Sequence, residues 1–113
     1  MPKYLAMFSY SDGAMAAMIE NPADREPAVR AILDSVGGHL ECLYWMFGPH
    51  DGIVVLDVPD SVTMAGINAA IRSTGSIRSE TYELFSTTDI RRILEAAGRA
   101  RTNFTEPGHA VQE

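Results

Sequence analysis

The sequence predicts an α+β fold of the ferredoxin-like type, a four-stranded antiparallel sheet with helices on one face and an extra C-terminal helix. Three observations predict it. Segments with an apolar period of two alternate along the chain with segments of helical period. Two strand-like segments in the middle are joined by a short turn, as in a β-hairpin. The resulting βαββαβ order is the split βαβ arrangement, and the 113 residues have room for one core.

The first half of the chain begins with alternating aromatic residues, which are typical of a strand. Asn21-Pro22 interrupts the helical pattern that follows, because proline fits the first turn of a new helix better than a helix interior. Gly37-Gly38 is expected to end the second helix. The expected elements up to this point are a strand over 3–10, a short helix over 14–20 and a main helix that starts near Ala23.

The strand expected over 39–47 divides by parity into two faces. Its even-numbered residues form the more apolar face, which we assign to the core: Leu40, Cys42, Tyr44 and Met46. Its odd-numbered residues would then face away from the helices: His39, Glu41, Leu43, Trp45 and Phe47. The turn 48–52 leads into a β-branched run over 53–56, which is typical of a central strand buried on both sides.

The second half repeats the helix–strand pattern. A helix over 62–73 is capped by Asp60 or Ser61 and is rich in small residues, so it can approach a sheet closely. The strand over 77–85 is more polar, which suits a sheet edge.

A final helix follows Ser86 or Thr87 and is expected to end at Gly98, with an extension through Arg99-Ala100 as the alternative. We therefore divide the chain into a ferredoxin-like domain over 1–87, a C-terminal helix of the same domain over 88–100 and a flexible tail over 101–113.

Composition and charge exclude several classes of function. A net charge of −6 without a basic cluster argues against nucleic acid and anionic membrane partners. No apolar run is long enough to cross a bilayer, and the N-terminal residues do not resemble a signal peptide. The single cysteine, Cys42, lies among apolar neighbours and is expected to be a buried thiol. A cytoplasmic location is expected.

The predicted architecture leaves one face of the sheet without helices. By parity this face would carry Leu43, Trp45, Phe47 and half of the central apolar run, and an apolar patch of this kind usually binds a partner. Pairing of two sheets would bury the patch, so we expect a homodimer or a higher symmetric oligomer.

Three segments resemble the GYD domain family over about residues 1–87. They are MPKYLAMFSYSDGAMAAM, GGHLECLYWMFGPHDGIVVLDVPD and INAAIRSTGSIRSETYELFS. The family is similar in fold to the dimeric α/β barrel group, whose members pair their sheets face to face, so the resemblance implies fold and assembly rather than an activity. Of the family's Gly-x-Tyr-Asp turn, Gly48 and Asp51 match, and His50 stands where the family has tyrosine. An imidazole that titrates near neutrality thus replaces a phenol.

The turn supplies the first candidate site, catalytic His50 and Asp51. A carboxylate beside an imidazole could act as a general base. Adjacent strand residues point to opposite faces, however, and aspartate in a turn commonly accepts hydrogen bonds from backbone N–H groups. Both interpretations stay open for His50.

Two further candidate sites come from polar and aromatic side chains. His39 and Glu41 share a strand face by their spacing, but without a second histidine they do not make a metal motif, and we expect neither a metal nor a cofactor. The aromatic residues could line a small cavity that takes an apolar or aromatic ligand, or could simply pack in the core. The expected ligand-binding residues are Tyr10, Trp45, Tyr82 and His39.

These observations leave three hypotheses about function. The first is a small cytoplasmic oligomeric binding or structural module. The second is a cofactor-independent enzyme that holds a small organic substrate between sheet and helices, with His50 or His39 as the proton-transfer group. The third is a haem-handling barrel, which requires His39 or His50 to face a cavity. Whether the chain is an enzyme is not decided by its sequence.

Overall fold

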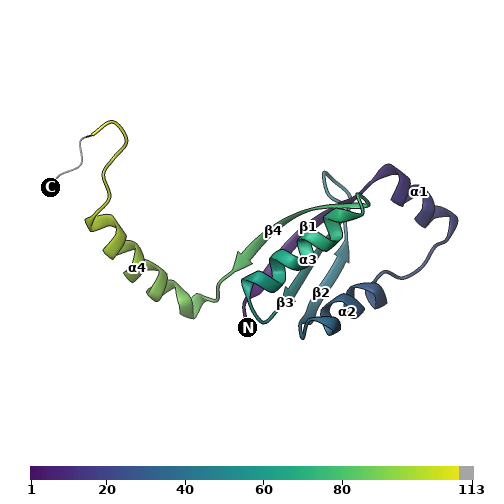
Figure 1. The fold of residues 1–113 in the computed structure, drawn as a ribbon, viewed down its shortest axis with the longest axis horizontal. Helices are drawn as coiled ribbons and strands as arrows, with labels where there is room; N and C mark the ends of the chain where they lie inside the picture. The colour runs from purple at the N-terminus through teal and green to yellow at the C-terminus, as the bar shows by residue number, and fades with distance from the viewer. Residues whose placement is uncertain (110–113) are drawn as a thin grey trace.

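The computed structural model describes residues 1–109 and shows a four-stranded antiparallel sheet with the strand order β2-β3-β1-β4 (Figure 1). The strands are β1 (Lys3–Tyr10), β2 (His39–Trp45), β3 (Gly52–Asp57) and β4 (Ile77–Leu84). The helices are α1 (Asp12–Glu20), α2 (Glu26–Ser35), α3 (Ser61–Ser73) and α4 (Ile90–Thr102), with a 3₁₀ turn, η1 (Thr87–Asp89), before α4. The predicted α+β, ferredoxin-like fold is confirmed.

Local sequence signals set the helix ends. The Ser11 hydroxyl accepts a hydrogen bond from the Ala14 N–H at 3.1 Å and caps α1, and the Asp60 carboxylate accepts one from the Thr63 N–H at 2.8 Å and caps α3. Gly37 and Gly75 have φ values of 73° and 71°, the left-handed conformation in which helices commonly end.

Two helix boundaries differ from the sequence prediction. The main helix starts at Glu26 rather than near Ala23, so that Pro27 falls in its first turn. The final helix continues past Gly98 to Thr102. The predicted flexible tail over 101–113 falls partly on this last helical turn and partly, at 110–113, outside the described residues.

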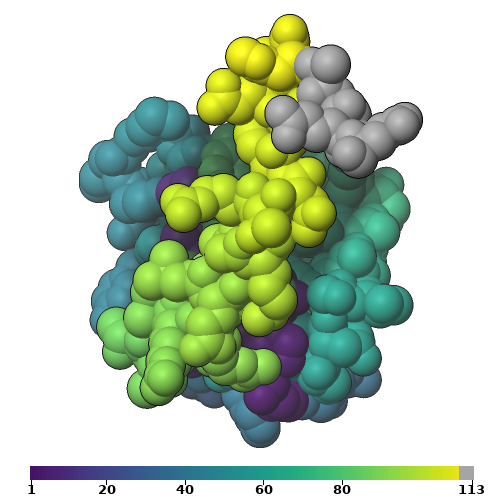
Figure 2. Space-filling view, turned by 90° about the vertical axis from the view of Figure 1, so that its left-hand side faces the viewer, coloured from purple at the N-terminus to yellow at the C-terminus, as the bar shows by residue number. Residues whose placement is uncertain are grey.

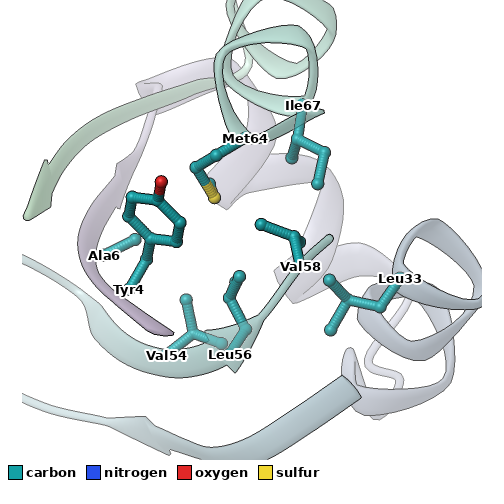
Figure 3. Packing of buried hydrophobic residues seen from close by; sticks show 8 residues of the cluster. All are labelled: Tyr4, Ala6, Leu33, Val54, Leu56, Val58, Met64 and Ile67. Carbon is teal, nitrogen blue, oxygen red and sulfur yellow. The ribbon is translucent and has the colours of Figure 1, made fainter. Parts of the chain in front are cut away.

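The core lies between the sheet and the pair α2 and α3. Figure 3 shows side chains of β1 and β3 meeting Leu33 of α2 on one side and Met64 and Ile67 of α3 on the other. The buried residues of this cluster are Tyr4, Ala6, Leu33, Val54, Leu56, Val58, Met64 and Ile67. Within residues 1–109 no helix covers the opposite face of the sheet, as the sequence predicted.

The parity assigned to β2 is wrong beyond its second residue, because a β-bulge interrupts the β2–β3 register between Leu40 and Cys42. One extra residue inverts the side-chain alternation after it. Leu43 therefore packs with Leu40 against the core, whereas Cys42 lies on the helix-free face. Cys42 is half-buried there and is not a core thiol.

The helix α4 stands apart from the sheet. It extends beyond the end of β4 in Figure 1, and Figure 2, viewed from that end, shows it in front of the rest of the molecule. The Asp89 carboxylate caps the 3₁₀ turn η1 before it by accepting a hydrogen bond from the Ser86 hydroxyl at 3.0 Å. The apolar side chains of Ile90 and Leu94 are exposed along it.

Candidate functional site

The side of the sheet opposite α2 and α3, called the open face below, is left without a covering layer by the described residues. The strand register places apolar side chains side by side across three strands of this face. Its apolar members on β1, β2 and β3 are Leu5, Met7, Cys42, Tyr44, Ile53 and Val55, and Tyr82 of β4 lies beside them opposite Leu5. Most of these side chains are partly exposed, and Tyr44 and Tyr82 are among the exposed large hydrophobic residues.

A charged cluster borders the open face at the start of β1. The Lys3 ammonium lies 2.8 Å from the Glu41 carboxylate of β2 and 3.3 Å from that of Asp57 on β3. The hydrogen bond to Glu41, together with that to Asp57, raises the pKa of Lys3 above its ordinary value. Because Glu41 is engaged in this way, it does not act as a partner for His39, which is exposed.

A second polar cluster borders the open face at the other end of β1. The His50 side chain is 22% exposed, its Nδ1 lies 3.3 Å from the Ser9 hydroxyl and its Nε2 lies 3.8 Å from a Glu80 carboxylate oxygen. The Tyr82 hydroxyl donates to the other oxygen of Glu80 at 3.0 Å, and this hydrogen bond raises the pKa of Tyr82. The cluster joins the β2–β3 turn to β1 and β4.

The hydrogen bonds of Ser9 determine what this cluster can do. When the Ser9 hydroxyl donates its single proton to the Pro49 carbonyl at 3.3 Å, its oxygen is an acceptor for the Nδ1–H tautomer of His50. Nε2 of His50 is then the nitrogen that can exchange a proton with a ligand or pair with Glu80. The imidazole is consequently placed to act as a proton donor or acceptor, but not to take the proton of Ser9 as in a serine nucleophile.

The structure does not bring Asp51 to His50, although the two were predicted together. The Asp51 carboxylate accepts a hydrogen bond from the Tyr10 N–H at 2.8 Å, and the Asp51 N–H donates to the Phe8 carbonyl at 2.8 Å. Asp51 thus ties the turn to the end of β1. The carboxylate that faces His50 belongs to Glu80, and this contact depends on the β1–β4 register, which no pattern in the sequence reveals.

The four predicted ligand-binding residues fall into three places. Tyr10 and Trp45 stack on each other, with ring centroids 5.6 Å apart and planes at 23°, on the side of the sheet that faces the helices. Trp45 is therefore not part of the open face, where parity had placed it. Tyr82 lies on the open face, and His39 lies exposed at the start of β2 on the same side of the sheet, opposite Asp57.

The described residues offer no prepared metal site and no membrane span. Within residues 1–109, no three histidine, cysteine, aspartate or glutamate side chains come together as metal ligands would. None of the helices formed by these residues combines the length and the apolar character that a bilayer crossing demands.

Fold and surface together define a small α+β domain whose sheet is covered on one face and open on the other. Comparison with protein families gives this class a name. The GYD domain family model matches residues 4–94, and the chain belongs to the GYD domain family.

A curated relative gives a further comparison. The chain is 22% identical over 90 residues to the "Glutamine synthetase and cystathionine beta-lyase binding protein" of Thermus thermophilus. The match covers 80% of this chain and 95% of the relative. The name of this relative describes a protein that binds enzymes.

Proposed function

We propose that this protein is a small oligomeric binding module that works in the cytoplasm, and that its first partner is a second copy of itself. The open face carries the proposal, because it presents a continuous apolar surface across three strands of a small domain. Pairing two such faces about a two-fold axis would bury the same side chains on both copies. The free thiol of Cys42 on that face suits a reducing compartment.

The relative from Thermus thermophilus supports the role as a binding module. A relative named for the enzymes that it binds favours protein surfaces as the class of partner. The helix α4 adds a surface of suitable chemistry, with four arginines and one glutamate in a chain of net charge −6. Its exposed apolar residues and its positive charge complement the acidic body of a second copy.

Sedimentation velocity over a range of concentrations tests the proposed pairing. We expect the wild-type protein to sediment as a dimer or higher oligomer at micromolar concentration. Val55→Glu should shift it to a monomer, because the change places a carboxylate at the centre of the open face. Ala69→Glu on the exposed side of α3 is the matched control and should leave the oligomer intact. A wild-type protein that stays monomeric at micromolar concentration would overturn the proposal.

A second candidate function is that of a small cofactor-independent enzyme, and the contact between His50 and Glu80 favours it. At the border of the open face, the Glu80 carboxylate faces His50, and the Nε2 of His50 is placed for proton transfer. Turnover of a panel of small organic esters and acids that His50→Gln abolishes and His39→Gln preserves would support this function. If both variants lose turnover equally, or both retain it equally, this second function is contradicted.

A further inference from the structure

A cavity of about 100 Å³ lies on the helix side of the sheet, between α2 and α3. Its origin is the placement of the two helices. α2 packs on β2 and α3 packs on β4, and these are the two edge strands of the sheet. The central strands between them are covered by side chains that reach in from both sides, as Figure 3 shows for Leu33, Met64 and Ile67. The cavity is the space that these side chains leave.

The walls of the cavity are mostly apolar. Side chains of β1, α2 and α3 form them, among them Phe8, Val29, Leu33, Met64, Ile67 and Ile71. An engineered apolar cavity of about 150 Å³ is large enough to bind benzene. The space found here therefore suits a smaller apolar group, such as a short branched hydrocarbon chain.

One cationic side chain lines this apolar space. Arg25 immediately precedes α2, and its Nε is buried without a hydrogen-bond partner among the described residues. The carboxylates next to it in sequence are engaged elsewhere. Asp24 accepts from the Glu26 N–H at 2.9 Å, and the Glu26 carboxylate pairs with Arg30 at 3.4 Å. The guanidinium thus reaches the cavity with an unpaired buried donor, which is unfavourable until an acceptor arrives.

We propose that this cavity binds a small organic carboxylate, with its carboxylate on Arg25 and its short apolar body between α2 and α3. A guanidinium binds a carboxylate through parallel N–H donors, so the ligand would satisfy the buried Nε and place its charge at the cavity mouth. The Asn68 amide and the Ser79 hydroxyl add neutral hydrogen-bonding groups to the lining. The site is independent of self-association, because it lies on the side of the sheet opposite the open face.

Titration of the full chain with isovalerate tests the proposal. Calorimetry and tryptophan fluorescence measure the binding. Trp45 is the single tryptophan, and it stacks on Tyr10, which lines the cavity. We expect saturable binding in the millimolar range, as is usual for so small a ligand. The neutral analogue 3-methyl-1-butanol should bind at least about tenfold more weakly, because it cannot form the charged contact. Equal affinity for the two compounds, or no saturable binding of isovalerate, overturns the proposal.

Three variants assign the binding to the cavity and to Arg25. Arg25→Gln should weaken isovalerate binding by about tenfold or more and leave the binding of the alcohol unchanged. Arg72→Gln makes the same replacement in the last turn of α3, where the side chain is exposed, and should leave both affinities unchanged. Ser79→Leu should fill the cavity and abolish both. An Arg25→Gln protein that binds isovalerate like the wild type would show that Arg25 is not the anchor.

Discussion

At the scale of single residues, the turn between β2 and β3 separates two roles that adjoin in the sequence. Asp51 faces β1 and holds its backbone at both Tyr10 and Phe8. His50 faces the open face and contacts Ser9 and Glu80. The aspartate of this turn thus has a structural role, and the neighbouring His50 is the residue that meets the surface.

This division predicts different effects of two alanine substitutions. Asp51→Ala should lower the free energy of unfolding by about 2 kcal/mol, because it removes a charged acceptor from a backbone N–H. His50→Ala should cost about 0.5 kcal/mol, as is common for a surface side chain with weak contacts. Urea unfolding measured by circular dichroism compares the two. A larger loss for His50→Ala than for Asp51→Ala would contradict the structural role of Asp51.

Asp60 gives a second prediction at this scale, on the dependence of stability on pH. The hydrogen bonds from Thr63 lower the pKa of Asp60 below its ordinary value, since they favour the charged carboxylate. Its contribution is then fully present above the unfolded-state pKa and is lost as the pH falls through the lower folded-state pKa. Asp60→Asn keeps a capping oxygen but cannot titrate, so its melting temperature should fall less steeply with acidification than that of the wild type. Parallel slopes in thermal melts across the acidic range would contradict the prediction.

At the scale of elements, the bulge in β2 determines which side chains belong to the core. The sequence could not reveal it, because a bulge inserts one residue without a distinctive residue type, and every later side chain changes face. Leu43 and Trp45 lie on the helix side for this reason, and Cys42 and Tyr44 lie on the open face.

Paired substitutions across the bulge test this assignment. Leu43→Ala should lower the free energy of unfolding by about 2 kcal/mol, because Leu43 packs against the core. Cys42→Ala should cost less than about 1 kcal/mol at protein concentrations too low for pairing. Guanidinium unfolding measures both values. A β2 strand without the bulge would place Cys42 in the core and Leu43 outside it, and would predict the larger loss of stability for Cys42→Ala. The two substitutions therefore distinguish the register with the bulge from the register without it.

The elements themselves were largely predictable, and their relations in space were not. Alternation and capping residues placed all four strands and the starts of α1 and α3 close to their observed positions. Contacts between distant strands depend on register, which no local pattern encodes. The contact of His50 with Glu80 and the buried Nε of Arg25 both arise from such long-range placement. For this reason the sequence could suggest His50 as a candidate but not the residues that it contacts.

At the scale of the whole molecule, the position of α4 makes the chain elongated. Its radius of gyration is 18.7 Å, and its extents are 64 × 31 × 24 Å. A compact domain of this length has a radius of gyration of about 13 Å. Ion pairs within α4 itself, such as Arg91 with Glu95 at 3.2 Å, help it to form without support from the sheet.

Small-angle X-ray scattering on a monomeric form tests this shape. The monomeric form is the Val55→Glu variant, or the wild type if it does not pair. We expect its radius of gyration to be close to 18.7 Å, because α4 then has no second copy to contact. A value of about 13 Å would show that α4 folds back onto its own domain. In that case its apolar side chains would compete with a second copy for the open face, and pairing would require α4 to be displaced. An elongated monomer leaves both the open face and α4 free to bind, as the proposed self-association requires.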